Sequence, residues 1–331
     1  MLGLTMGDPA GIGPEIIAKA WSSLHGPRVV YGDACVMMQA IEQFSPHLTL
    51  RRVRQHDFAH LGDQTDVMAL IETSAFSSMP DAGVVSAACG EAAYQAITAA
   101  IADARDGLLQ GLVTAPIHKE AMHLAGVEYP GHTEMLMDLS GAPEVGMVLA
   151  NDDIAVVLAT IHCSLREALD KIANGAVPQA LRLAALAGRD LGFDNARIAV
   201  AGVNPHAGEG GLFGDEEIHY ITPAIEHARA AGMQVSGPYA GDTVFMRARQ
   251  KEFDVVVAMY HDQGLIPVKY LGVEAGVNMT CGLPFVRTSP DHGTAFDKAW
   301  QGIADESAFG YAYRHARRVL SRRLASATVE G

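Results

Sequence analysis

Two short apolar runs, Ile154-Ala-Val-Val-Leu-Ala159 and Arg197-Ile-Ala-Val-Ala-Gly202, flank the stretch Val177–Leu191, in which apolar residues recur with a helical period. Short Val- and Ile-rich runs are typical of strands that are buried on both faces. The helical stretch between them is long enough for a crossover connection, which joins parallel strands. The segment therefore predicts a strand–helix–strand unit of an α/β sheet.

The same alternation continues in both directions along the chain. We expect further strands at Leu2–Met6, Arg28–Tyr31, Leu48–Val53, Val67–Ile71, Gly111–Thr114, Gly146–Ala150 and Asp254–Met259. We expect further helices at Pro14–Ser23, Gly90–Asp106, Asp215–Ala231 and Ala308–Leu324. Strands that alternate with helices predict an α/β fold around a largely parallel sheet.

The length of 331 residues is enough for two compact lobes. We expect the chain to cross between the lobes near residue 130 and again near residue 285. Residues 1–130 and 285–331 would then form the first lobe. Residues 131–284 would form the second lobe, which carries the candidate metal ligands.

Composition limits the class of protein and its partners. The formal net charge of −14 argues against a nucleic-acid partner, because a phosphate backbone needs a basic face. No apolar run approaches the ~20 residues that span a bilayer, and the N-terminus turns polar too early for a signal peptide. The four cysteines have no paired spacing, which favours reduced thiols. We therefore expect a cytoplasmic globular protein without a membrane partner.

Three histidines follow three of the expected strands. His162 comes after Ile154–Ala159, His206 after Arg197–Gly202 and His261 after Asp254–Met259. Ligand sites of open α/β sheets lie at the carboxyl ends of strands, so the three imidazoles can converge there. Three imidazoles suit Zn²⁺, Co²⁺ or a similar divalent ion and leave positions open for substrate oxygens. Each histidine alone is equally typical of a hydrogen-bonded loop residue.

A second group of residues suggests an anion site. Residues 130–134, Pro-Gly-His-Thr-Glu, open a helix, whose backbone N–H groups and Thr133 hydroxyl could meet a phosphate. Lys269, Asn278 and Arg287 lie beside expected apolar segments further along the chain. An ordinary helix cap and ordinary salt bridges would account for the same residues.

Residues 7–15, Gly-Asp-Pro-Ala-Gly-Ile-Gly-Pro-Glu, follow the first strand and begin a helix. They do not match the Gly-x-Gly-x-x-Gly fingerprint, so a standard Rossmann domain is not expected. A tight strand-to-helix turn would account for these glycines.

Six segments, taken together and in order, resemble the 4-hydroxythreonine-4-phosphate dehydrogenase (PdxA) family over essentially the whole chain. They include two long and unusual strings, Asn204-Pro-His-Ala-Gly-Glu-Gly-Gly211 and Met259-Tyr-His-Asp-Gln-Gly264. The others are Met6–Glu15, Thr114–Lys119, Tyr129–Glu134 and Gly276–Ala295. Residues 291–297, Asp-His-Gly-Thr-Ala-Phe-Asp, also resemble the cofactor loop of isocitrate and isopropylmalate dehydrogenases.

The resemblance implies a two-lobed α/β/α subunit of the isocitrate/isopropylmalate dehydrogenase type and a homodimer with its active sites at the subunit interface. It implies that one Zn²⁺, Mg²⁺ or Co²⁺ per site is held by His162, His206 and His261, with His261 expected from the other subunit. It implies that the substrate is bound by His132, Thr133, Lys269, Asn278 and Arg287. NAD or NADP would be bound by the loop residues His292, Gly293, Thr294 and Ala295.

The implied reaction is an oxidation of a phosphorylated hydroxy acid, 4-phosphooxy-threonine, followed by decarboxylation to an amino-ketone phosphate in pyridoxine biosynthesis. Asp242 and Asp262 are the candidate general bases. Other members of the family act on 4-phospho-D-threonate or 4-phospho-D-erythronate. Three motifs of this chain, which begin at His123, Gly211 and Ala295, look closer to the phospho-threonate branch. A phosphate acyltransferase and a phosphometabolite-binding protein are the alternatives outside the family, and neither needs three converging histidines.

Overall fold

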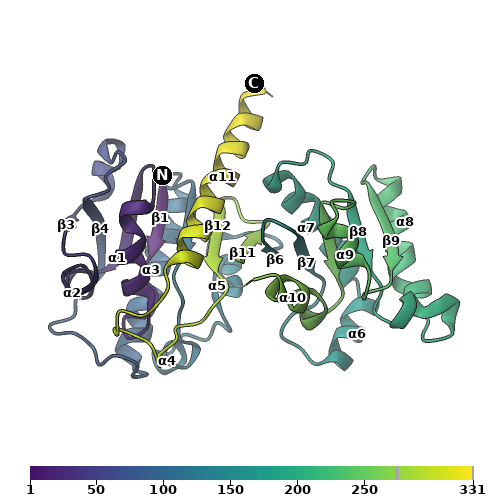
Figure 1. Cartoon of the computed structure of the whole chain (residues 1–331), viewed down its shortest axis with the longest axis horizontal. Helices are drawn as coiled ribbons and strands as arrows, with labels where there is room; N and C mark the ends of the chain where they lie inside the picture. The colour runs from purple at the N-terminus through teal and green to yellow at the C-terminus, as the bar shows by residue number, and fades with distance from the viewer. Residues whose placement is uncertain (273–275, 330–331) are drawn as a thin grey trace. The chain divides into compact units, whose positions relative to one another are not determined.

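The computed structural model describes residues 1–272 and 276–329 (Figure 1). The chain groups into two compact units, unit 1 with residues 1–144 and 283–320, and unit 2 with residues 145–282 and 321–331. The first division falls later than the expected crossing near residue 130, because helix α5 (His132–Ser140) packs on α3 (Ala87–Arg105) of unit 1. The end of the chain also differs from the expectation, because residues 321–329 group with unit 2 and not with the first lobe. Residues 330 and 331 of the expected first lobe, and residues 273–275 of the expected second lobe, lie outside the described part.

Unit 1 is built on parallel strands. The described strands are β1 (Leu2–Thr5), β2 (Arg28–Asp33), β3 (Thr49–Arg52), β4 (Val67–Ser74), β5 (Gly111–Thr114) and β12 (Val286–Pro290). They stand in the order β3-β4-β2-β1-β5-β12, and every neighbouring pair is parallel. This order differs from the 3-2-1-4-5-6 order of a Rossmann domain, in agreement with the missing fingerprint.

Helices cover both faces of the unit 1 sheet. Besides α3 and α5, they are α1 (Gly13–Ala20), α2 (Ala34–Phe44), α4 (Lys119–Leu124) and the first part of α11 (Ser307–Val329). The connections through α1 and α2 move across the sheet in one direction, and the connection through α3 moves back. Since such crossovers are right-handed, α1 and α2 lie on one face and α3 lies on the other.

Unit 2 has the same layered construction. Its described strands are β6 (Gly146–Ala150), β7 (Ala155–Leu158), β8 (Ile198–Ala201), β9 (Val235–Tyr239), β10 (Val255–Ala258) and β11 (Val277–Cys281). They stand in the order β11-β6-β7-β10-β8-β9, in which β6 runs antiparallel to both of its neighbours. Its helices are α6 (Leu165–Ala173), α7 (Ala176–Leu191), α8 (Thr222–Ala230), α9 (Val244–Arg249) and α10 (His261–Tyr270).

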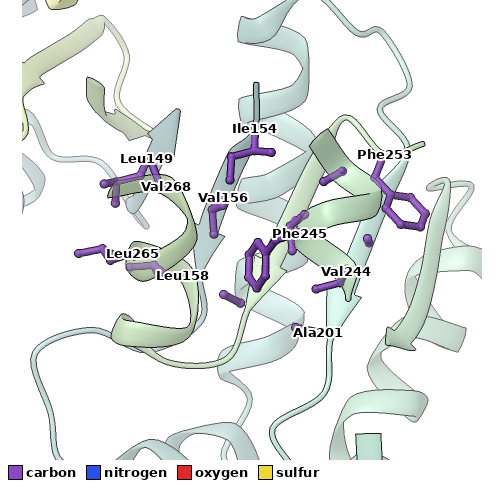
Figure 2. Packing of buried hydrophobic residues seen from close by; sticks show 14 of the residues in the cluster. Leu149, Ile154, Val156, Leu158, Ala201, Val244, Phe245, Phe253, Leu265 and Val268 are labelled. Carbon is purple, nitrogen blue, oxygen red and sulfur yellow. The ribbon is translucent and has the colours of Figure 1, made fainter. Parts of the chain in front are cut away.

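The core under α9 and α10 fixes the position of the candidate site (Figure 2). Leu265 of α10 and Phe245 of α9 pack against the strand residues Val156 and Leu158. A Cβ atom at Gly264 would lie 2.4 Å from Leu158 Cδ2, so only glycine lets α10 approach β7 this closely. The start of α10, where His261 lies, is therefore held against the sheet.

The α/β class is confirmed, and all the strands expected from the sequence are present within a few residues at their ends. Strands β9, β11 and β12 were not predicted. The expected helix Asp215–Ala231 begins with a π-helical turn, Glu217–Ile221, before α8. Among the described residues, no helix is long and apolar enough to cross a membrane.

Candidate active site

The three candidate metal ligands lie at one edge of the unit 2 sheet. His162 follows β7, His206 follows β8 and His261 begins α10 directly after β10. Strand β10 lies between β7 and β8 and is parallel to both, so all three histidines follow carboxyl ends on the same edge. His162 and His206 have positive φ angles of 47° and 53°. Left-handed backbone at residues other than glycine is strained, and such residues cluster at functional sites.

Two of the histidines lie side by side. The ring centroids of His162 and His261 are 5.7 Å apart, and both rings line a cavity of about 510 Å³. Nδ1 of His261 lies 2.7 Å from Oδ1 of Asp262. A carboxylate on one ring nitrogen fixes the tautomer and leaves the other nitrogen available for a metal. Asp262 is therefore placed to orient His261.

His206 lines a neighbouring cavity of about 620 Å³ together with Asp242, Tyr260 and Asp262. Among residues 1–272 and 276–329, no group of three or more His, Cys, Asp or Glu side chains could hold a metal ion. The pair His162 and His261 nevertheless fits a metal, because two imidazoles on one tetrahedral ion have ring centres roughly 5–6 Å apart. The three-histidine site thus stays a prediction.

The loop that carries His206 is fixed by Glu217, which the sequence did not single out. The buried carboxylate of Glu217 accepts hydrogen bonds from the backbone N–H groups of Val203 and Asn204, at 2.7 and 2.8 Å. It also accepts one from the Asn204 side chain at 2.9 Å. Glu217 lies in the expected helix Asp215–Ala231, and nothing in the sequence indicates its contacts with the loop.

The expected anion site has its parts in both units. In unit 1, α5 begins at His132 without a side-chain cap, which leaves backbone N–H groups at its N-terminus. Arg287 on β12 is buried and donates a hydrogen bond from Nη2 to Thr114 Oγ1 at 2.7 Å. Burial lowers the pKa of Arg287 to about 10, so its guanidinium stays charged at neutral pH. Thr133 is half-buried in the first turn of α5.

His132 belongs to the same cluster in unit 1. Burial lowers the pKa of His132 well below its ordinary value, and the positive charge of Arg287 adds to this effect. Its Nε2 atom is buried without a hydrogen-bond partner among the described residues. An orphaned polar atom beside a buried cation fits a site that is completed by an anionic ligand.

Lys269 and Asn278 lie in unit 2. Lys269 is exposed in the last turn of α10. Asn278 on β11 donates a hydrogen bond from Nδ2 to Met147 Sδ at 3.3 Å, and its buried Oδ1 has no partner among the described residues. The structure therefore groups His132 and Arg287 in unit 1, whereas Lys269 and Asn278 are held by unit 2.

The expected cofactor loop follows β12 and rests on the Gly-rich loop after β1. The backbone N–H of Ile12 donates to Thr294 O at 3.0 Å, and Thr294 is buried. Ala295 has a left-handed φ of 43°, and Phe296 stacks on the His118 ring with centroids 4.6 Å apart. His292 places Nδ1 3.0 Å from Gly293 O, while its buried Nε2 has no partner among the described residues. Residues 7–13, which suggested only a turn, therefore support this loop.

Asp8, in the same Gly-rich loop, is a charged residue that sequence reasoning missed. It is fully buried, and Oδ1 accepts the backbone N–H of Ala10 at 2.9 Å. Burial raises the pKa of Asp8 to about 6, although the Ala10 hydrogen bond and nearby His118 partly oppose this rise. A buried carboxyl with a raised pKa at the carboxyl end of a strand is typical of functional regions.

Known proteins resemble the chain in sequence and in structure. The family described as pyridoxal phosphate biosynthetic protein PdxA matches residues 25–316. A 4-hydroxythreonine-4-phosphate dehydrogenase of Beijerinckia indica is 56% identical over 96% of this chain and 94% of its own. A D-threonate 4-phosphate dehydrogenase of Salmonella typhimurium is 46% identical over 96% of this chain and 98% of its own.

The crystal structure of a 4-hydroxythreonine-4-phosphate dehydrogenase from Klebsiella pneumoniae superposes with a TM-score of 0.89 at 43% identity, covering 97% of this chain and 98% of that one. The layered α/β units and these likenesses define a dehydrogenase that acts on a phosphorylated hydroxy acid. The chain belongs to the PdxA family, and its catalysis is of the 4-hydroxythreonine-4-phosphate dehydrogenase type.

Proposed function

We propose that the chain oxidises 4-phosphooxy-threonine with NAD or NADP and that the resulting β-keto acid loses CO₂ to give an amino-ketone phosphate. The observation that carries the proposal is the pair of imidazoles, His162 and His261, 5.7 Å apart at the carboxyl ends of neighbouring strands. The 56% identity with the Beijerinckia protein supports the choice of substrate. The proposed setting is the synthesis of pyridoxine in the cytoplasm.

When bound, a divalent metal supplies a Lewis acid that lowers the pKa of a substrate hydroxyl, and NAD or NADP supplies the hydride acceptor. His162, His206 and His261 would hold the metal, which is Zn²⁺, Mg²⁺ or Co²⁺. Asp262 orients His261, which leaves Asp242 as the better placed of the two candidate bases. Residues 292–295 would bind the cofactor.

The phosphate of the substrate would serve as the handle that orients the reacting carbon. Arg287, Lys269 and the N-terminus of α5 supply positive charge or N–H donors. His132, Thr133 and Asn278 supply polar atoms, of which two are buried and without partners among the described residues. Binding energy that is gained at the phosphate can then serve catalysis at a distance from it.

The proposal includes a homodimer in which each active site takes a metal ligand from both chains. Its structural support is that the described residues of a single chain bring His162 and His261 together but hold no three-ligand group. Symmetric pairs are the commonest assemblies of identical chains.

A second substrate is favoured by the Salmonella relative, which is a D-threonate 4-phosphate dehydrogenase. With 4-phospho-D-threonate, or with D-erythronate 4-phosphate, the same reaction would give a hydroxyketone phosphate instead of an amino-ketone phosphate. NADH or NADPH formation should be followed by absorbance with each acid, and the products separated by mass. The substrate with the higher kcat/KM decides between the candidates.

The control for the reaction class is the same assay after removal of metal with a chelator. Activity should disappear and return on addition of Zn²⁺, Co²⁺ or Mg²⁺. An acyltransferase would need neither metal nor nicotinamide, and a binding protein would show no turnover with any acid. Retention of full activity without metal would contradict the proposed site.

Substitution of the candidate ligands tests the site itself. His162→Ala, His206→Ala and His261→Ala should each abolish turnover and bound metal, because three ligands are the usual number at a catalytic metal with an open position. Thermal unfolding should show that the fold is kept. Full metal occupancy in any two of these variants would rule out the three-histidine site.

A further inference from the structure

A chain of side-chain hydrogen bonds joins the three strand ends that precede the histidines. The backbone C=O of Met259 accepts a hydrogen bond from Thr160 Oγ1 at 2.7 Å. The backbone N–H of Met259 donates to Gln263 Oε1, also at 2.7 Å. Gln263 Nε2 in turn donates to Gly202 O at 2.7 Å. Thr160 and Met259 are buried, and Gln263 is half-buried.

Each member of this chain stands shortly before a candidate ligand. His162 lies two residues after Thr160, His261 two residues after Met259, and His206 four residues after Gly202. A backbone bond from Ala159 N to Ala258 O at 2.8 Å also links the ends of β7 and β10. The side chains of Thr160 and Gln263 therefore extend the cross-strand bonding past the ends of β7, β10 and β8.

We propose that Thr160 and Gln263 are positioning residues that set the spacing of the three histidine loops and thereby the affinity for a divalent metal. The inference rests on the proposed metal site. Both residues act through the backbone of Met259, whose two polar groups they satisfy.

The chemistry of the two side chains fits this role. A side-chain amide can accept from one backbone N–H and donate to another backbone C=O at the same time. A carboxylate in place of Gln263 would still accept from Met259 but would face Gly202 O without a proton to donate. The Thr160 hydroxyl satisfies a buried carbonyl, which is costly to leave unpaired.

The test is a titration of purified full-length apoprotein with Zn²⁺ or Co²⁺ in competition with a chromophoric chelator. Thr160→Val and Gln263→Met keep side-chain size and remove the hydrogen bonds. Both should weaken metal binding about 10- to 100-fold, as the loss of outer partners of metal ligands does. Thr160→Ser, which keeps the hydroxyl, should stay within a few-fold of the wild type.

Thr288→Val is the matched control, because Thr288 makes the same kind of buried bond to Ala312 O at 2.9 Å but belongs to unit 1. It should lose stability and keep full metal affinity. Unchanged metal affinity in Thr160→Val and Gln263→Met would overturn the inference. His162→Ala in the same series tests the proposed site separately, since unchanged binding there would overturn the site instead. If Thr160→Val does not fold, the metal affinity of Gln263→Met still decides the outcome.

Discussion

Ionisation of the buried Asp8 carboxyl destabilises the folded state. A pKa of about 6 is some two units above the ordinary value of 3.8, which costs the folded state about 3 kcal/mol once the group is ionised. The folded chain keeps the proton more firmly than the unfolded chain. The stability that protonated Asp8 gives the folded state is therefore fully present below pH 4 and is lost as the pH rises through about 6.

Asp8→Asn should remove this dependence, because the amide keeps an acceptor for the Ala10 N–H and carries no charge. The variant should be about 3 kcal/mol more stable than the wild type at pH 7 and nearly equal to it at pH 4. Urea unfolding between pH 4 and pH 8 measures both values. Parallel pH profiles for the two proteins would show that Asp8 is not the titrating group.

Arg287 and Lys269 are expected to contribute through charge-assisted contacts to phosphate. Lys269→Ala should lower kcat/KM about ten- to hundredfold, because such a contact contributes about 1.5–3 kcal/mol. Arg287→Lys should also lower it, since a lysine keeps the charge but loses the planar fork that bonds Thr114 at 2.7 Å. The measurement is steady-state kinetics, with thermal unfolding as the control for folding. Wild-type kinetics in both variants would place the phosphate elsewhere.

At the scale of elements, the candidate cofactor loop contacts His118, the residue that caps the N-terminus of α4. The ring of His118 stacks on Phe296 at 4.6 Å with an interplanar angle of 22°, and its Nδ1 accepts the Ala121 N–H at 3.4 Å. The stack and the helix cap can be separated by substitution. His118→Phe keeps a ring, whereas His118→Asn keeps a side-chain acceptor.

If the stack positions the loop, His118→Asn should raise the KM for NAD or NADP about three- to tenfold and leave kcat nearly unchanged. His118→Phe should restore the wild-type KM. His123→Ala, an exposed histidine of the same helix, should have no effect. A wild-type KM in His118→Asn together with a raised KM in His118→Phe would assign the effect to the helix cap.

The strands that carry apolar runs could be predicted from the sequence. The strands that were missed, β9, β11 and β12, lack such runs. β9 reads Val-Ser-Gly-Pro-Tyr, and its glycine and proline are tolerated because β9 stands at the edge of the strand order. β12 contains Arg287 and Pro290, so it lacks an apolar run, although its pairing with β5 buries it. Burial here follows from long-range pairing.

The candidate site was predicted to a similar extent. That each histidine follows a strand could be predicted from local pattern alone. That His162 and His261 lie together depends on the pairing of β10 with β7, across about a hundred residues of sequence. Thr160 and Gln263 carry no sequence signal, because ordinary polar residues acquire their partners only in the folded sheet.

At the scale of the whole molecule, mixing inactive variants can show which histidine crosses between chains. Suppose that one of the three ligands of each site comes from the partner chain. Two variants that lack ligands contributed by different chains then form a hybrid dimer with one intact site. About half of the dimers are hybrids after free exchange, so about a quarter of the wild-type activity should return. Two of the three pairwise mixtures of His162→Ala, His206→Ala and His261→Ala should recover.

The mixture that fails identifies the two ligands of a single chain. Failure of His162→Ala with His206→Ala would make His261 the donated ligand, as the family resemblance implies. Failure of His162→Ala with His261→Ala would make it His206, in line with the two rings 5.7 Å apart. Recovery in none of the mixtures, after confirmed exchange, would contradict a shared site.

The position of β12 has a consequence for synthesis on the ribosome. Gly111 of β5 pairs with Leu2 on one side and with Val286 on the other, so one side of β5 must wait for residues made much later. The residues of unit 2 up to 282 emerge in between as one continuous stretch. In nascent chains that end before β12, unit 2 should therefore already resist protease, while the edge of β5 that later pairs with β12 is still unpaired. The protein is expected to depend most on chaperones during that interval of translation.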